Sequence, residues 1–177
     1  YPKNCPACGE PLMKLGEIWK CCNVDCIAQQ RAAMIYWCSK DCMDVRTLGE
    51  KTINELLMKN IGIHDIPSLY GFFHSYTDED IVGLLGDGYG LQKIQNIKKG
   101  LKDSLSKPLE KIIYAIGIDG VGKVTARDLV KKFKNIGGIF NATKNELMEI
   151  DGIGEVVASA IYAFGHNIPF ESEYDKW

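Results

Sequence analysis

The stretch Asp119-Gly120-Val121-Gly122-Lys123 decides the fold, because it recurs 32 residues later as Asp151-Gly152-Ile153-Gly154-Glu155. Each stretch lies between two segments whose apolar residues recur with helical spacing. An alanine follows the second glycine by four residues in both copies, at Ala126 and Ala158. An internal repeat of this kind predicts pairs of helices that are joined by short glycine turns.

The glycines of this turn have a physical purpose. They give the backbone access to positive φ and allow two helices to approach closely, while the apolar residue between them packs under the turn. The second helix then begins with unpaired N–H groups at the positive end of its dipole, where a phosphate can bind without any base being read. Such turns resemble the helix-hairpin-helix motif of proteins that bind DNA without sequence specificity. A simple pair of packed helices is the alternative, but the repetition with matched flanks favours phosphate binding.

Two further copies of the turn precede these. Residues 86–90 read Gly-Asp-Gly-Tyr-Gly, with Gly86 at the position that is aliphatic elsewhere. Residues 45–49 form a degenerate copy, in which Thr47 replaces the first glycine. The candidate DNA-binding residues are the glycines of the three full turns and two nearby lysines: Gly88, Gly90, Lys93, Gly120, Gly122, Lys123, Gly152 and Gly154.

Charge is distributed unevenly along the chain, although the net charge is only −2. Residues 61–89 carry no basic and 5 acidic side chains, whereas residues 90–135 carry 11 basic and 4 acidic side chains. Residues 136–177 carry 2 basic and 7 acidic side chains. The basic block therefore begins at the copy of the turn in residues 86–90 and includes the copy at Gly120-Val121-Gly122. A solvated helix face is the alternative, but the position beside the turns favours a surface that follows a phosphate backbone.

The cysteines indicate a metal site. All seven lie within residues 5–42, and Cys5/Cys8 and Cys21/Cys26 form two closely spaced pairs. Four thiolates in two pairs can surround one zinc ion tetrahedrally and leave no position for water, so the predicted site is structural. Cys22 is an alternative to Cys21, and redox chemistry at the first pair is the competing interpretation. The two remaining thiols follow at i, i+4 and are interpreted as apolar core residues: Cys38 and Cys42.

Composition sets the broad class. The chain is 46% hydrophobic and 25% charged, as is usual for a globular protein. No apolar run is long enough for a membrane span, and a cysteine-based metal site predicts a reducing, cytoplasmic setting. The chain begins at Tyr1 without a methionine, so we expect it to be part of a longer protein. The predicted class is mainly α, with a zinc finger over residues 1–30, four helix-hairpin-helix motifs over 31–165 and a linker or docking tail over 166–177.

Six motifs occur in a fixed order: Cys5-Pro6-x-Cys8-Gly9, Cys21-x-Asn23-x-x-Cys26-x-Ala28-Gln29, Met43-Asp44-Val45-x-x-Leu48-Gly49-Glu50-Lys51, Pro108-Leu109, Ala115-Ile116-Gly117-Ile118-x-x-Val121-Gly122 and Gly152-Ile153-Gly154. Together they resemble the C-terminal half of NAD-dependent DNA ligases, over nearly the whole chain from Asn4 to Phe164. The resemblance implies that the chain grips nicked double-stranded DNA through minor-groove phosphates, as part of strand sealing in replication and repair.

The resemblance also implies what the chain does not do. Such ligases adenylate a lysine in a Lys-x-Asp-Gly motif, whereas here Gly117 and Glu149 stand at the lysine position before Asp119-Gly120 and Asp151-Gly152. We therefore expect no catalytic residue in this chain, with NAD used only by an adenylation domain that, like an OB-fold module, lies in cis or in a separate subunit. Two alternatives are a DNA-binding subunit or scaffold of another repair enzyme, and a protein-interaction module built from helical hairpins.

Overall fold

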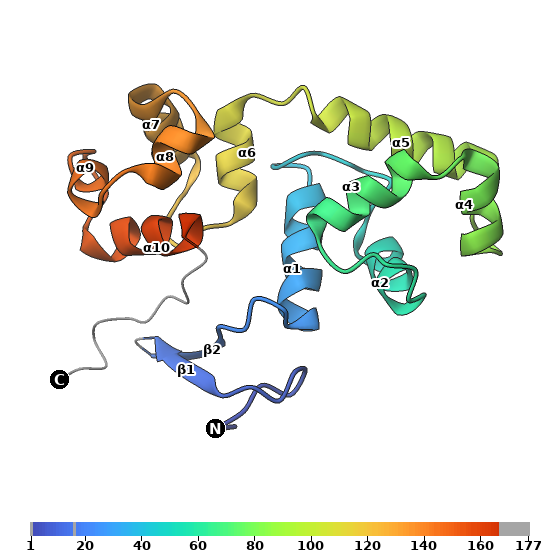
Figure 1. Cartoon of the computed structure of the whole chain (residues 1–177), viewed down its shortest axis with the longest axis horizontal. Helices are drawn as coiled ribbons and strands as arrows, with labels where there is room; N and C mark the ends of the chain where they lie inside the picture. The colour runs from blue at the N-terminus through green and yellow to red at the C-terminus, as the bar shows by residue number, and fades with distance from the viewer. Residues whose placement is uncertain (1, 16, 167–177) are drawn as a thin grey trace. The chain divides into compact units, whose positions relative to one another are not determined.

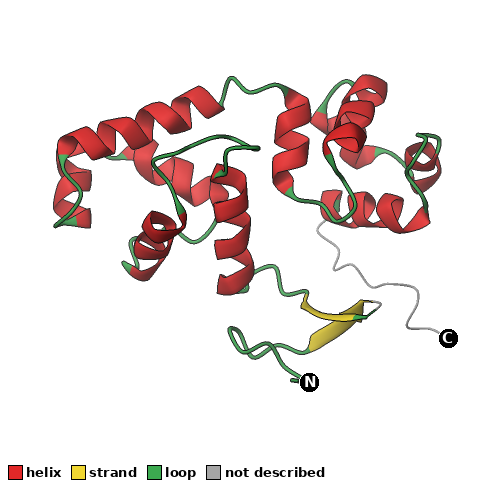
Figure 2. Cartoon of the chain, turned by 180° about the vertical axis from the view of Figure 1, so that it is seen from behind, coloured by secondary structure: helices red, strands yellow, loops and turns green. Residues whose placement is uncertain are grey.

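The computed structural model describes residues 2–15 and 17–166 (Figure 1). Its described part is mainly helical with one small pair of strands (Figure 2), which confirms the predicted fold class. The elements are β1 (Leu12–Leu15), β2 (Ile18–Cys21), α1 (Ile27–Cys38), α2 (Glu50–Met58), α3 (Ile66–Ser75), α4 (Asp78–Leu85), α5 (Leu91–Ser104), α6 (Leu109–Ile116), α7 (Lys123–Phe133), α8 (Ile136–Asn141), α9 (Lys144–Met148) and α10 (Glu155–Gly165). None of the described helices is long and apolar enough to cross a membrane.

The chain divides into two compact units. The central unit is Asp25–Lys107, and the terminal unit combines the residues up to Val24 with those from Pro108 onward. The division into a finger over 1–30, a helical domain over 31–165 and a tail remains a prediction. All but the first residue of that tail, His166, lies outside the described residues.

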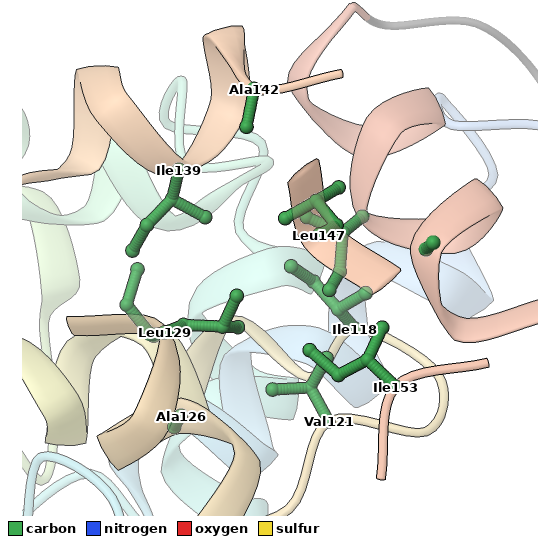
Figure 3. Close-up of a cluster of buried hydrophobic side chains, with 11 residues drawn as sticks. Ile118, Val121, Ala126, Leu129, Ile139, Ala142, Leu147 and Ile153 are labelled. Carbon is green, nitrogen blue, oxygen red and sulfur yellow. The ribbon is translucent and has the colours of Figure 1, made fainter. Parts of the chain in front are cut away.

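In the terminal unit, β1 and β2 form an antiparallel hairpin that places Leu12 opposite Cys21 and Met13 opposite Lys20. The helices of the same unit enclose a single buried cluster (Figure 3). Val121 and Ile153, the residues between the glycines, are only 7% and 4% exposed and belong to this cluster. The two turns are thus held by apolar residues that pack beneath them, as the sequence predicts.

The core of the central unit is crossed by a polar chain that joins three helices. Trp37 Nε1 on α1 donates to the hydroxyl of Tyr70 on α3 at 3.0 Å, and that hydroxyl lies 2.6 Å from Ser104 Oγ on α5. Cys38 and Cys42 are buried here, in agreement with their interpretation as core thiols. Burial, with a smaller effect of the adjacent Cys42, raises the pKa of Cys38 to about 12, which disfavours the reactive thiolate.

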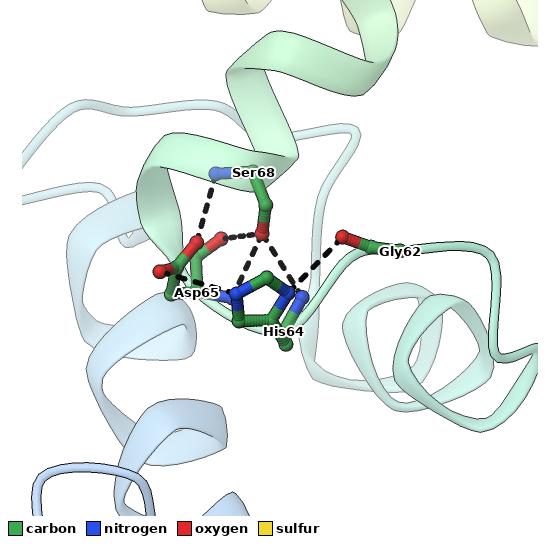
Figure 4. Close-up of polar contacts among 4 residues, drawn as sticks. All are labelled: Gly62, His64, Asp65 and Ser68. Carbon is green, nitrogen blue, oxygen red and sulfur yellow. Dashed lines mark hydrogen bonds and ion pairs between the residues drawn. The ribbon is translucent and has the colours of Figure 1, made fainter.

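Polar caps begin several helices. Thr77 and Thr143 accept hydrogen bonds from the backbone of Asp80 and Glu146, as their positions predict. The sequence Thr143-x-x-Glu146 is typical of a capping box, but only the hydrogen bond from the Glu146 N–H to Thr143 is found in the described part of the chain, whereas a complete box forms at α3. There the N–H of Ser68 donates to Asp65 Oδ1 at 2.8 Å (Figure 4).

Proline is typical of the first position of a helix, which predicts a helix that starts at Pro108, but Pro108 is the N-cap, with an extended ψ of 151°. The helix α6 therefore begins one residue later, at Leu109.

Candidate nucleic-acid interface and metal centre

Four helices begin in the same unusual way. Their N-caps are all glycines in extended conformation, and no side chain caps their first N–H groups: Gly49 on α2, Gly90 on α5, Gly122 on α7 and Gly154 on α10. In each, the carbonyl of the capping glycine accepts a hydrogen bond from the N–H of the residue four positions later, so regular helical hydrogen bonding begins at the cap itself. The positive, N-terminal end of each helix therefore presents backbone N–H groups that no side chain of the cap satisfies. Such an end attracts an anion.

The residues before these caps form one recurring turn. We name the first turn (residues 45–49), second turn (86–90), third turn (118–122) and fourth turn (150–154). In all four, the N–H of the fourth residue donates to the carbonyl of the first, at 3.0, 3.2, 3.0 and 3.1 Å in chain order. The third residue has positive φ in the last three turns, at 87° for Gly88, 82° for Gly120 and 88° for Gly152.

The first turn keeps this hydrogen bond without a glycine at its third position. Thr47 does not take positive φ, and the left-handed residue of this region is Asp44, with φ of 53°. Gly49 still caps α2 with φ of −77°. The buried Oγ1 of Thr47 has no hydrogen-bond partner among the described residues, which is a cost of this replacement. The degenerate copy thus keeps the open start of α2, although its left-handed residue is Asp44 and not a glycine at the third position of the turn.

The two glycines of the third turn serve different purposes. A Cβ at Gly120 would lie 2.7 Å from Val157 Cγ2 on α10, so this glycine is needed for packing as well as for its positive φ. A Cβ at Gly122 would meet nothing within 4 Å, and the same is true at Gly90 and Gly154. The backbone at these N-caps is therefore open to a ligand.

Two lysines lie beside the third turn. Lys123 begins α7 and its Nζ lies 5.7 Å from the ring centre of Tyr114 on α6. Asp119 in the turn is paired with Lys20 on β2, whose Nζ lies 2.6 Å from Asp119 Oδ2. Lys131 and Lys132 lie in the last turn of α7, at the end away from the third turn. This is the most cationic of the open helix starts in the terminal unit.

The fourth turn has the same backbone and the opposite charge. Glu155 takes the place of Lys123 as the first residue after the capping glycine. Its carboxylate is favourable to the helix dipole but repels a phosphate at the same N–H groups. The last turn of α10 holds no basic residue.

The second turn is fixed by a tyrosine. Tyr89 is 3% exposed, and its hydroxyl donates to Glu55 Oε2 on α2 at 2.6 Å. Burial and this carboxylate raise the pKa of Tyr89, while the hydrogen bond lowers the pKa of Glu55. Lys93 Nζ lies 4.1 Å from the centre of the Tyr89 ring, which holds this predicted DNA-binding lysine beside the turn.

Four cysteine sulfurs gather near the start of the chain. The Sγ atoms of Cys5, Cys8, Cys21 and Cys26 all lie within 4.8 Å of one another, and Cys8 and Cys21 are 3.6 Å apart. Tetrahedral zinc with Zn–S bonds of about 2.3 Å requires sulfurs roughly 3.8 Å apart, so the four residues fit such an ion. Cys22, the alternative ligand, is outside this group and its Sγ faces the carbonyl of Lys20 at 4.0 Å.

The environment of Cys5 favours its thiolate. Backbone N–H groups of Ala7 and Cys8 donate to the Cys5 sulfur and lower its pKa to about 7, against a smaller opposing effect of burial. A deprotonated sulfur is the form that binds a metal ion. Burial instead raises the pKa of Cys22, which leaves that thiol the poorer ligand.

Sequence reasoning missed two contacts at these sites. The Glu55–Tyr89 hydrogen bond had a visible signal, because tyrosine stands where the other turns have an aliphatic residue. The Lys20–Asp119 ion pair had none, because its partners are 99 residues apart and neither belongs to a repeated pattern that joins them.

The repeated glycine turns and open helix starts define a protein built from helix-hairpin-helix motifs, and comparison with known families supports this class. The family described as the helix-hairpin-helix motif matches residues 111–171, which include the third and fourth turns. Over nearly its whole length the chain is also similar to DNA ligases. It is 37% identical over 94% of its length to the DNA ligases of Persephonella marina and Sulfurihydrogenibium azorense, and 34% identical over 99% to that of Aquifex aeolicus. The chain is therefore consistent with the C-terminal region of a DNA ligase, which confirms the resemblance to ligases. It spans 23–24% of the length of these relatives.

Proposed function

We propose that this chain is the duplex-DNA-binding portion of an NAD-dependent DNA ligase and grips nicked DNA through its phosphates. The observation that carries the proposal is the set of open, glycine-capped helix starts, of which those at Gly90 and Gly122 lie in the basic block. Backbone N–H groups at these starts receive phosphate oxygens, and Lys93 and Lys123 add positive charge beside them. The similarity to DNA ligases supports the assignment to strand sealing.

The adenylation chemistry belongs to another part of the ligase in this proposal. The chain has no Lys-x-Asp-Gly motif, so we propose no catalytic residue in it and assign NAD to an adenylation domain in cis or in a second subunit. The contribution of this chain is to hold the duplex while an adenylation domain and an OB-fold module act on the nick. Phosphate contacts position a duplex without reading its sequence, which suits an enzyme that must act at any nick.

A structural zinc ion in the four-cysteine cluster completes the proposal. Cys5, Cys8, Cys21 and Cys26 would hold it, and a closed site of four thiolates supplies folding energy rather than chemistry. The strands β1 and β2 are four residues each, which is too little for a core of their own. The metal would therefore stabilise this segment by an amount on the order of 10 kcal/mol.

The DNA-binding proposal is tested by titrating the protein with nicked duplexes of two unrelated sequences at several salt concentrations. The two affinities should agree, and the logarithm of the association constant should fall linearly with the logarithm of salt concentration. A strong preference for one sequence, or binding that does not change with salt, would contradict the proposal.

The metal proposal is tested by elemental analysis of protein purified without chelator. We expect about one zinc per chain, and removal of the metal should unfold the N-terminal segment, as seen by loss of protection from proteolysis. A Cys22→Ser variant is the matched control and should keep its metal, whereas Cys21→Ser should lose it. Less than about half an equivalent of metal in the wild type would contradict the site.

A further inference from the structure

An aspartate recurs in the second, third and fourth turns, where its negative charge would oppose the binding of a phosphate. Asp87, Asp119 and Asp151 each stand directly before the left-handed glycine of the second, third and fourth turns. Each is therefore three residues before the glycine that caps the open helix start. A carboxylate so close to that start repels an approaching phosphate, unless a cation neutralises it.

Asp119 is distinguished from the other two by its partner. Lys20 Nζ lies 2.6 Å from Asp119 Oδ2, whereas the described residues provide no ion pair for Asp87 or Asp151. Both side chains of the pair are partly exposed, at 36% for Lys20 and 64% for Asp119, so the pair faces solvent where a ligand can approach. It also stands in the turn that precedes Lys123, rather than in the turn that precedes Glu155.

The place of Lys20 is fixed by the β-hairpin. Lys20 stands opposite Met13 and is followed by Cys21, one of the four clustered cysteines. Lys14 lies in the same hairpin opposite Trp19, and no ion pair of Lys14 is found in the described part of the chain. The hairpin thus offers two lysines, of which one reaches Asp119.

We propose that Lys20 is a positioning residue of the third turn, which neutralises Asp119 and so makes the open start of α7 acceptable to a DNA phosphate. This inference rests on the proposed function. It gives the four-cysteine segment a role in DNA binding beyond its own fold, because that segment supplies the cation. The fourth turn, whose Asp151 has no ion-pair partner in the described part of the chain, remains electrostatically unsuited to phosphate.

The test is a double-mutant cycle on affinity for a nicked duplex at low salt. Lys20→Met should weaken binding by about threefold to fivefold, as expected for loss of an exposed ion pair. Asp119→Asn should bind at least as tightly as the wild type, and Lys20→Met should have no further effect when added to it. Lys20→Arg should restore wild-type affinity, since it keeps the charge.

Two controls isolate the pair. In an Asp151→Asn background, Lys20→Met should cause the same loss as in the wild type, because Asp151 is not its partner. Lys14→Met removes one charge from the same hairpin and should change affinity less than Lys20→Met. Thermal unfolding of each variant shows whether it is folded. If Lys20→Met does not fold, Asp119→Asn and Lys20→Arg still test the proposal, because both should bind DNA at least as well as the wild type.

Two outcomes would overturn the inference alone. One is an equal loss from Lys20→Met with and without Asp119, which would mean that the lysine acts on DNA independently of this carboxylate. The other is no loss in the wild-type background. Failure of the wild type itself to bind duplex DNA would overturn the proposed function, and this inference with it.

Discussion

The third and fourth turns have nearly the same backbone and opposite electrostatics. Gly122 and Gly154 cap their helices at φ of −90° and −89°, and the N–H groups of Ala126 and Ala158 donate to them at 2.9 Å in both. The next residue is Lys123 in one and Glu155 in the other. The comparison teaches that the turn motif specifies how two helices pack, and we propose that the charge beside it decides whether a phosphate can bind there.

Their packing also differs in one respect. The third turn lies against α10, the second helix of the fourth turn, through Gly120 and Val157, while nothing lies within 4 Å of the position of a Cβ at Gly152. The two turns are therefore parts of one structure, in which the fourth supports the third. We infer a division of tasks in which the third turn contributes affinity for DNA and the fourth contributes shape.

The largest effect is expected on stability, from alanine at the first glycine of each turn. Gly120→Ala should cost about 1–2 kcal/mol for its left-handed backbone and about 1–3 kcal/mol more for the clash with the stiff side chain of Val157. Gly152→Ala should cost only the backbone term of about 1–2 kcal/mol. Chemical denaturation measures both, and equal losses would contradict the packing difference between the turns.

Reversing the charge after each capping glycine should give the next largest effect, this time on DNA affinity. Lys123→Glu should weaken binding to duplex DNA by on the order of tenfold at low salt and reduce its salt dependence, because a cation is lost and an anion gained. Glu155→Lys should strengthen binding, since it converts the fourth turn to the charge of the third. Salt titrations of the two variants check this. The electrostatic contrast would be refuted if Lys123→Glu did not weaken binding and Glu155→Lys did not strengthen it.

A smaller effect is expected from Lys132 on α7, which contacts the residues just before the fourth turn. Lys132 Nζ donates to Glu149 Oε2 at 2.6 Å and to the carbonyl of Glu146 at 2.8 Å. Lys132→Met should therefore lower stability by up to about 1 kcal/mol. Its neighbour Lys131, which is exposed, is the control. Lys131→Met should leave the unfolding midpoint unchanged and weaken DNA binding more than Lys132→Met does.

The repeated turns were predictable from sequence because their chemistry is local. Positive φ at Gly120 and Gly152, the buried residues Val121 and Ile153, and the caps at Thr77 and Thr143 follow from residues within a few positions of one another. The pairing of Cys5/Cys8 with Cys21/Cys26 was also signalled by spacing, and the structure brings these four sulfurs together without Cys22.

The contacts between distant segments could not be predicted in the same way. No local pattern tells that Gly120 must accommodate Val157, or that Lys20 reaches Asp119. Such contacts depend on how completed helices pack, and a single sequence does not encode them as a motif. A proline is typical of the first helical position, but Pro108 lies one position earlier, at the N-cap, because its ring also suits the extended conformation there.

The central claim is that the third turn, and not the fourth, receives a DNA phosphate on its backbone. It is tested most directly by comparing Gly122→Ala with Gly154→Ala, since a Cβ at either position meets nothing within 4 Å and neither residue has positive φ. Both variants should therefore lose the same small amount of stability, up to about 1 kcal/mol, because alanine is a poorer N-cap than glycine. The account predicts that Gly122→Ala weakens binding to a nicked duplex by on the order of tenfold, because the added methyl group blocks the phosphate, while Gly154→Ala binds like the wild type. Equal losses from both variants, or a loss from Gly154→Ala alone, would contradict it.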